Sequence, residues 1–198
     1  MCGRYYFTYE AAQEALTLAD LLDTRSETVG EGDVHPADLA WVVCSDAQKH
    51  RLVLASMRWG FPGHERSQVI FNARAETAME KSLFRDSMLF RRCASPAGGF
   101  YEWNPKGEKV SFTGREKKIL YLAGFYRCFE EMNCFVILTT EANRSLQGVH
   151  DRMPLVLKEE DVKRWILDKE RAEILLSQAP PLLSSFQEYE QQTLPLFF

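Results

Sequence analysis

The spacing of apolar side chains predicts helices in four parts of the chain. Residues 10–22 are rich in Ala, Leu and Glu, which favour helix. Residues 159–167 begin with three acidic side chains and continue into an apolar face, the pattern of a helix start. The predicted helices are residues 10–22, 78–90, 159–167 and 171–177, with a turn or short helix at 143–148.

Strands are predicted where β-branched and aromatic residues form short runs between Gly, Pro and polar turns. After Pro96 the chain is especially rich in such runs. The predicted strands are residues 39–44, 52–59, 69–71, 99–103, 109–112, 119–126, 134–139 and 193–198. Because strands do not alternate regularly with helices, a doubly wound parallel sheet is disfavoured. We expect a single α+β domain over residues 1–198, built on a curved, largely antiparallel, barrel-like sheet with flanking helices.

Composition narrows the class of protein. Of the 198 residues, 45% are hydrophobic and 26% are charged, a normal globular balance. No export signal and no apolar run long enough to span a membrane is present, so we expect a cytoplasmic protein without membrane partners. The five cysteines form no C-x-x-C pair, which argues against a disulfide framework, a zinc site or another metal cofactor. Apart from Cys2, they are predicted to be small buried residues.

Charge is distributed unevenly along the chain. The net charge is −4, which excludes a general polyanion binder. Residues 1–50 carry 3 basic and 9 acidic side chains, whereas residues 51–100 carry 8 basic and 4 acidic ones. A basic middle segment suits a confined phosphate-binding groove. Charge alone favours the simpler interpretation, an ordinary solvated surface.

The second residue is a cysteine, and this gives the N-terminus a specific chemistry. Removal of Met1 would leave Cys2 with a free α-amine beside its thiol. An α-amine has a reference pKa near ~7.7–8.0, so part of it is neutral at pH 7, and the neighbouring ammonium lowers the pKa of the thiol. Such an aminothiol condenses with an aldehyde to an imine and then closes to a thiazolidine. The alternative is that a Cys at this position has no function.

Asn72 and Arg74 follow a predicted strand in the segment 71–77 (FNARAET). Asn72 could donate to a sugar oxygen or contact the Cys2 amine, and Arg74 could bind a phosphate. The structural alternative is a capped turn, in which Asn72 bonds to the local backbone and Glu76 begins the helix.

Glu102 is the only carboxylate within the aromatic run 98–103 (GGFYEW). Alternation along a strand places Glu102 on the same face as Phe100 and opposite Tyr101 and Trp103. If that face is buried, the carboxyl pKa rises and the group can act as an acid or base near neutrality. Otherwise Glu102 faces solvent or pairs with an arginine.

His150, Asp151 and Arg152 lie together before a proline in the segment 148–154 (GVHDRMP). Histidine is the side chain that titrates near neutrality, so His150 is a candidate proton donor or orienting group. The alternative is a loop histidine that only bonds to its neighbours.

Six segments in order resemble the SRAP (SOS response-associated peptidase) family. They are residues 1–5 (MCGRY), 59–60 (WG), 72–77 (NARAET), 92–103 (RC before GFYEW), 139–143 (TTEAN) and 150–154 (HDRMP). The resemblance runs from Cys2 to about Pro154. It implies a DNA-damage-response protein that shields abasic sites in single-stranded DNA through a covalent thiazolidine crosslink, with an autopeptidase that removes Met1 and with hydrolase or lyase chemistry.

The resemblance also implies residue roles. Cys2 would be the nucleophile through its amine and thiol, and Glu102 the acid and base. Asn72 would hold the sugar or the Cys2 amine, and His150 would assist proton transfer. Three arginines would line the path of the DNA phosphates: Arg4, Arg74 and Arg152.

Two departures from the family pattern affect the expected site. Residues 33–36 (DVHP), with His35 and Pro36, replace a Tyr-Asn-x-Ala-Pro motif that many relatives carry. The segment 61–70 is shorter than in many relatives, which leaves Phe61 as the candidate aromatic for stacking on a neighbouring base.

Two other functions remain open from the residues. An N-terminal-nucleophile amidotransferase also begins Met-Cys-Gly, but it leaves Asn72, Glu102 and His150 unexplained. A non-covalent module for single-stranded DNA would instead combine aromatic stacking with arginines. Its arginines would be Arg58, Arg74, Arg85, Arg91 and Arg92.

Overall fold

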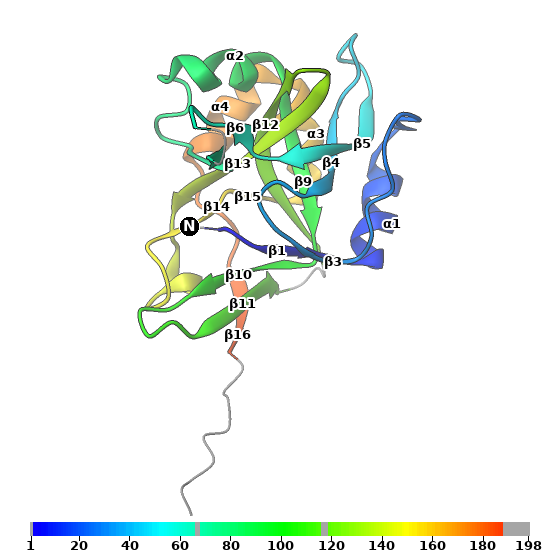
Figure 1. Cartoon of the computed structure of the whole chain (residues 1–198). Helices are drawn as coiled ribbons and strands as arrows, with labels where there is room; N and C mark the ends of the chain where they lie inside the picture. Colours follow the sequence, from blue (N-terminus) through cyan, green and yellow to red (C-terminus); the bar gives the residue numbers. More distant parts are fainter. Residues whose placement is uncertain (1, 66–67, 116–118, 188–198) are drawn as a thin grey trace, which may run out of the picture.

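A closed barrel of five strands forms the centre of the computed structural model, which describes residues 2–65, 68–115 and 119–187 (Figure 1). The barrel consists of β4 (Leu39–Ser45), β5 (Leu52–Trp59), β9 (Arg92–Ala97), β12 (Leu120–Phe129) and β13 (Met132–Glu141). Neighbouring strands pair antiparallel from β5 through β4, β9 and β12 to β13. A parallel pairing of β13 with β5 closes the barrel. The structure thus confirms the predicted α+β class and the largely antiparallel, barrel-like sheet.

Strand β9 was not predicted, because its sequence lacks the alternation that marks a half-exposed strand. All six of its residues are buried, and three of them are Ala or Ser. A strand buried on both faces needs no polar alternation, and small residues give little strand signal. The neighbouring strand β12 is also closely packed. A Cβ on Gly124 of this strand would lie 2.4 Å from the Val136 carbonyl oxygen, so only glycine fits there.

A second, antiparallel sheet lies below the barrel in the view of Figure 1. Its strands, in order, are β16 (Leu183–Gln187), β11 (Lys109–Gly114), β10 (Gly99–Trp103), β1 (Tyr5–Phe7) and β3 (Gly32–Val34). The predicted strands at 99–103 and 109–112 are found here. The short strands β1, β3 and β16 were missed. The strand predicted at residues 193–198 lies outside the described residues.

Short strands extend these two sheets or pair with one another. They are β2 (Leu21–Leu22), β6 (Phe61–Pro62), β7 (Val69–Ile70), β8 (Asn72–Arg74), β14 (Arg152–Pro154) and β15 (Val156–Leu157). Strand β8 pairs parallel with β13, and β14 pairs antiparallel with the end of the same strand. Both therefore end near one edge of the barrel, where the candidate chemistry gathers.

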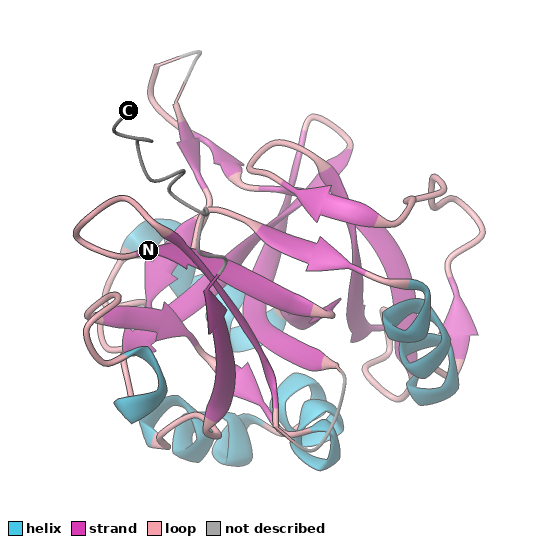
Figure 2. Ribbon diagram, turned by 90° about the horizontal axis from the view of Figure 1, so that it is seen from below, coloured by secondary structure: helices cyan, strands magenta, loops and turns pink. Residues whose placement is uncertain are grey.

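The helices lie around the outside of the strands (Figure 2). They are α1 (Tyr9–Leu18), α2 (Ser82–Phe90), α3 (Glu159–Leu167) and α4 (Lys169–Ser177), with a 3-10 turn η1 (Arg144–Leu146). All four predicted helices are confirmed. Helix α1 begins where the Thr8 hydroxyl accepts a hydrogen bond from the Ala11 N–H, and it ends before Leu21–Leu22 join β5 as a strand. Among the described residues, none of the helices is both long and apolar enough to cross a membrane.

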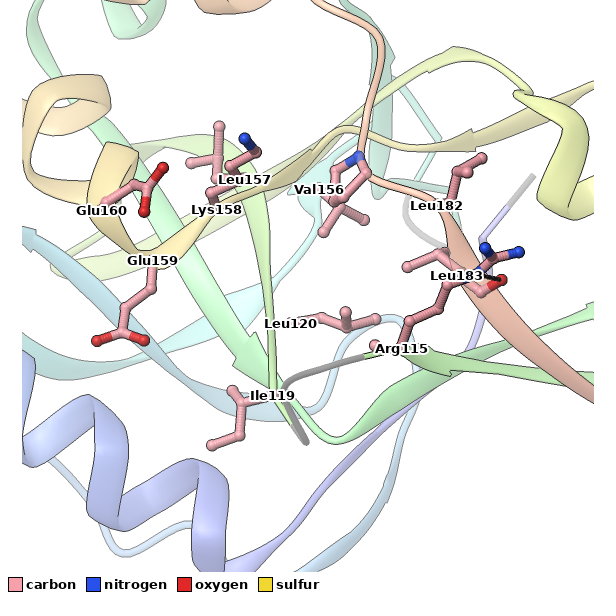
Figure 3. A pocket seen from close by; sticks show the side chains of 12 residues that line it. Arg115, Ile119, Leu120, Val156, Leu157, Lys158, Glu159, Glu160, Leu182 and Leu183 are labelled. Carbon is pink, nitrogen blue, oxygen red and sulfur yellow. Dashed lines mark hydrogen bonds between the residues drawn. The ribbon is translucent and has the colours of Figure 1, made fainter.

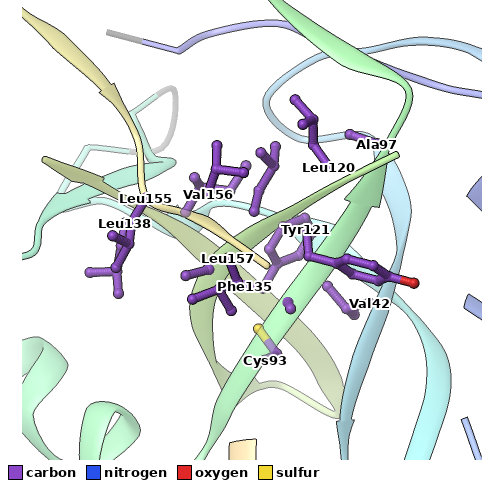
Figure 4. Close-up of a cluster of buried hydrophobic side chains, with 14 of the residues drawn as sticks. Val42, Cys93, Ala97, Leu120, Tyr121, Phe135, Leu138, Leu155, Val156 and Leu157 are labelled. Carbon is purple, nitrogen blue, oxygen red and sulfur yellow. The ribbon is translucent and has the colours of Figure 1, made fainter. Parts of the chain in front are cut away.

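Apolar side chains fill the barrel (Figure 4). Val42, Cys93 and Phe135 point into this core from three different strands, and all three are fully buried. Cys44 and Cys134 are buried as predicted, but Cys128 is exposed near the end of β12, where the strand extends past the packed interior. The barrel is thus a packed support, and the buried polar or charged side chains on its described strands are those of Arg92, Ser95 and Thr139.

Candidate active site at the junction of the two sheets

Pairing of β1 with β10 brings the N-terminal segment against Glu102. Tyr5 lies opposite Phe100, so continuing this antiparallel register places Gly3 opposite Glu102. The carbonyl oxygen of Arg4 accepts hydrogen bonds from the Tyr101 N–H (3.0 Å) and from the Cys2 thiol (3.8 Å). Cys2 has no exposed surface. Burial, followed by the charge of Glu102, raises the pKa of the Cys2 thiol.

Glu102 is buried, with 3% of its surface exposed. Along β10, Phe100 and Glu102 point inward while Trp103 is exposed, as the alternation predicted. Burial raises the pKa of the Glu102 carboxyl above its ordinary value of 4.5, and the nearby His150 partly opposes this rise. The solvent-facing alternative for Glu102 is therefore wrong, and the carboxyl group can hold a proton closer to neutral pH.

Asn72 connects the barrel to the N-terminal segment. It begins β8, where it lies opposite Ile137 of β13, and its Nδ2 donates to the Cys2 carbonyl oxygen at 2.7 Å. Its other amide atom, Oδ1, is buried and has no hydrogen-bond partner among the described residues. A buried acceptor without a partner is costly. Asn72 thus bonds far along the chain rather than capping a local turn, and Oδ1 is available to an N–H or O–H group next to Cys2.

His150 lies at the edge of the same site, with 26% of its side chain exposed. Its Nδ1 accepts a hydrogen bond from the Arg152 backbone N–H at 2.9 Å, and it is also 2.9 Å from Oδ1 of Asp151. An accepting Nδ1 places the proton of the neutral ring on Nε2. The carboxylate of Asp151 is the partner suited to a protonated Nδ1. The neutral ring of His150 thus has a donor, the Arg152 N–H, and the protonated ring has an acceptor, the Asp151 carboxylate.

The three predicted phosphate-binding arginines differ in their surroundings. Arg152 forms a two-pronged ion pair with Glu76 (2.8 and 2.9 Å) and donates to the Thr139 carbonyl oxygen (2.6 Å). This pairing lowers the pKa of Glu76. Arg4 lies 3.8 Å from Asp33, in the segment that departs from the family pattern, and 5.4 Å above the Trp103 ring. Arg74 is exposed and forms no ion pair within the described part of the chain.

A hollow of about 890 Å³ opens beside His150, and we call it the His150 hollow. It is lined by β8, the end of β13, the loop around η1 and the start of β14. Its charged and titratable lining residues are Arg74, Glu141, Arg144, His150, Asp151 and Arg152. Arg144 was not among the predicted site residues. A separate cavity of about 520 Å³, lined by Arg115, Leu120 and Leu183, contains none of the predicted site residues (Figure 3).

Two further sequence interpretations are wrong. Phe61 cannot stack on a base, because its ring is fully buried against Phe84, Phe125 and Phe129. Arg92, one of the arginines of the non-covalent model, is 6% exposed and donates to backbone carbonyls of α3. No group of three or more His, Cys, Asp or Glu suited to a metal ion occurs in residues 2–65, 68–115 and 119–187.

Known proteins with similar sequences are named abasic site processing proteins. The chain is 30% identical to the abasic site processing protein YoaM of Bacillus subtilis, over 85% of this chain and 80% of YoaM. It is 29% identical to the abasic site processing protein YedK of Escherichia coli, over 91% of this chain and 88% of YedK. A crystal structure of a protein from Bordetella bronchiseptica has the same fold, with a TM-score of 0.77 at 20% identity, covering 96% of this chain and all of that one.

The family-level match covers nearly the whole sequence. The model of the SOS response associated peptidase (SRAP) family matches residues 1–195, which include every candidate residue described above. The chain belongs to the SRAP family.

Proposed function

We propose that this protein, once Met1 is removed, captures abasic sites in single-stranded DNA as a covalent thiazolidine on Cys2. The proposal is carried by one observation, the placement of Cys2 between the amide of Asn72 and the buried carboxyl group of Glu102. The names of the relatives YoaM and YedK supply the substrate class, an abasic site. An abasic deoxyribose in its ring-opened form is an aldehyde, the partner that an aminothiol requires.

The proposed reaction forms two bonds on one carbon. The Cys2 α-amine adds to the C1′ aldehyde, and the resulting carbinolamine loses water to give an imine. The Cys2 sulfur then bonds to the same carbon while its proton moves to the imine nitrogen. The product is a five-membered ring containing nitrogen and sulfur. One water molecule leaves, and no oxidant, reductant or metal is consumed.

Glu102 suits the proton transfers of this sequence. Protonated Glu102 can donate to the departing hydroxyl of the carbinolamine, and its carboxylate can then take a proton from the amine nitrogen. Both roles require a pKa near the working pH, and burial shifts the pKa of Glu102 in that direction. Asn72 would hold the amine or the sugar through Oδ1, and His150 would relay protons at the edge of the site, including during reversal.

The pKa of the Cys2 thiol shifts in the direction opposite to the one that the sequence predicts for the trimmed chain. The aminothiol of a trimmed chain is expected to have a lowered thiol pKa, whereas in the chain that carries Met1 burial raises the pKa of Cys2. In the chain that carries Met1, the Cys2 thiol is therefore held protonated more strongly than that of an ordinary cysteine. Removal is a hydrolysis that leaves a carboxylate on Met1 and a free amine on Cys2, which is the step a peptidase of this family would catalyse.

A denaturing gel tests the covalent mechanism. Trimmed protein is incubated with a single strand that carries one abasic site, or with the same strand left intact, and no reducing agent is added. We expect a shifted band only with the abasic strand. Cys2→Ala should give no band, and Cys128→Ala, which removes an exposed thiol elsewhere, should match wild type. An equal band from Cys2→Ala, or none from wild type, would overturn the proposal.

The same material separates the rival functions. An amidotransferase requires glutaminase activity that depends on Cys2, and our proposal requires none. A non-covalent binding module predicts equal retention of abasic and intact strands by wild type and Cys2→Ala in a native gel. Either result, combined with the absence of the denaturant-resistant band, would replace the covalent mechanism.

A further inference from the structure

One short segment, residues 72–76, is bonded to both sides of the candidate active site. At its start, Asn72 donates to the Cys2 carbonyl oxygen at 2.7 Å. At its end, Glu76 forms the two-pronged ion pair with Arg152. Asn72 has a role in the proposed reaction, whereas Glu76 has so far been only an ion-pair partner. The ion pair links the segment that holds Cys2 to the start of β14.

The guanidinium of Arg152 is tied to protein groups by its terminal nitrogens. Nη1 and Nη2 each donate to one carboxylate oxygen of Glu76, at 2.8 and 2.9 Å, and Nη2 also donates to the Thr139 carbonyl oxygen at 2.6 Å. The remaining nitrogen, Nε, is buried and has no hydrogen-bond partner among the described residues. A two-pronged pair fixes geometry as well as adding energy. Glu76 therefore fixes the direction of the Arg152 side chain.

The backbone of Arg152 contacts the His150 ring. Arg152 is the first residue of β14, and its N–H donates to Nδ1 of His150 at 2.9 Å. Glu141 of β13 lies opposite Arg152 in the strand pairing. The position of this N–H is thus set by two supports, the strand pairing and the ion pair of the Arg152 side chain with Glu76. Without the ion pair, the first peptide of the strand would keep the pairing alone.

Two groups compete for Nδ1 of His150. The Arg152 N–H needs an unprotonated Nδ1, which places the proton of the neutral ring on Nε2. The Asp151 carboxylate, 2.9 Å from the same nitrogen, needs a protonated Nδ1. Asp151 is 87% exposed, so water weakens its contact with the ring. The placement of the Arg152 N–H therefore decides which ring nitrogen of neutral His150 carries the proton.

We propose that Glu76 is a positioning residue, which acts through Arg152 to hold neutral His150 with its proton on Nε2. The inference rests on the proposed function, because that reaction gives His150 a proton to transfer. The hydrogen bond at one ring nitrogen of a histidine sets the protonation of the other. The effect of Glu76 passes through two contacts, the ion pair and the hydrogen bond from the Arg152 N–H to Nδ1.

The proton on the His150 ring can be located by NMR. Protein trimmed of Met1 and labelled with ¹⁵N at histidine is observed at pH 8, where ordinary histidine side chains are neutral. Protonated and unprotonated ring nitrogens resonate far apart, and the His150 signals are identified by their loss in His150→Asn. Wild type should show a protonated Nε2, and Glu76→Gln should show a substantial fraction of protonated Nδ1. Thermal denaturation checks that the variant, which keeps the shape of a half-exposed side chain, is folded.

Single-turnover adduct formation gives the matching kinetic test. Across a concentration series of abasic single strand, the saturating rate of Glu76→Gln should fall roughly 5- to 20-fold, part of the about 10²–10⁴-fold that a positioned acid or base contributes. The half-saturating concentration should stay at the wild-type value, because the substitution changes proton transfer rather than strand binding. A residue that acted on the DNA through Arg152 would instead change the half-saturating concentration.

Glu141→Gln is the matched control. Glu141 is exposed in the same hollow and lies opposite Arg152 on β13, so its substitution removes an equal charge at a similar place without touching the ion pair. It should leave the His150 ring and the saturating rate unchanged. In the Arg152→Gln background, Glu76→Gln should cause no further loss of rate, because its route to His150 is already gone.

The outcomes separate this inference from the proposed function. A wild-type ring or a wild-type saturating rate in Glu76→Gln, an equal loss in Glu141→Gln, or a further loss in the Arg152→Gln background would overturn the role of Glu76. Each of these results is compatible with a covalent adduct at Cys2. A displaced ring proton in Glu76→Gln without any adduct from wild type would overturn the proposed function and leave the placement of the His150 proton by Glu76 standing.

Discussion

Cys2 and Glu102 have almost no exposed surface, whereas Arg74 and Arg144, in the adjoining hollow, are open to solvent. His150 lies between these two regions, with a quarter of its side chain exposed. This difference in exposure to solvent suits the function proposed for each region. A carboxyl group needs exclusion of water to keep a raised pKa, while a phosphate-binding guanidinium needs access to a charged polymer. The buried region suits bond formation, and the exposed region suits recognition of the strand.

The largest expected effect comes from the buried region. Glu102→Gln keeps the shape of the side chain but cannot shuttle protons. We expect adduct formation with the abasic strand to slow by about 100-fold or more, the usual contribution of a positioned acid or base. Single-turnover kinetics on denaturing gels would measure this. A rate within about threefold of wild type would remove Glu102 from the mechanism.

Substitutions of Arg152 and Arg144 should affect the stability of the protein differently, although both residues line the hollow. Arg152→Gln loses the ion pair to Glu76 and a hydrogen bond to the Thr139 carbonyl, so unfolding free energy should fall by about 2 kcal/mol. For a chain of this size that corresponds to a decrease in Tm of roughly 4–8 °C. Arg144→Gln should change stability by less than about 0.5 kcal/mol. Equal shifts in thermal denaturation would contradict the separation of their roles.

The smallest expected effect is a gain in stability for Glu102→Gln. In wild type, burial raises the pKa of Glu102, so the folded protein keeps this proton at pH values where the unfolded chain has lost it. Stability is therefore complete below the unfolded pKa and declines as pH rises through the folded pKa. The variant lacks this decline. It should equal wild type near pH 4 and exceed it at pH 7 in denaturant titrations, and a variant less stable at both pH values would contradict the burial argument.

The sequence predicted the buried region better than the exposed one. Alternation along residues 99–103 correctly paired Glu102 with buried Phe100, because one strand face is decided by local pattern. Partners distant in sequence were not predictable. Glu76 pairs with Arg152, 76 residues away, and Asp33 lies beside Arg4, so two of the arginines predicted to contact DNA also have protein partners that the sequence did not indicate.

The fold, too, was only partly predictable from local sequence patterns. The helices and the alternating strands were predicted, while β9 was missed because its small residues are buried on both faces. Phe61 was considered for base stacking, and only the packing of α2 and β12 against it shows that it belongs to the core. Local pattern defines which face of an element is apolar, and tertiary packing decides which polar groups remain free.

The bond between Cys2 and the abasic carbon is the central claim, and carbon NMR tests it most directly. A single strand with ¹³C at C1′ of its abasic site is mixed with trimmed protein and observed without reduction. We expect a saturated carbon bonded to nitrogen and sulfur, present in wild type and absent when Met1 is retained. A resonance that stays at the aldehyde or sugar position, or an imine carbon that never becomes saturated, would contradict the thiazolidine.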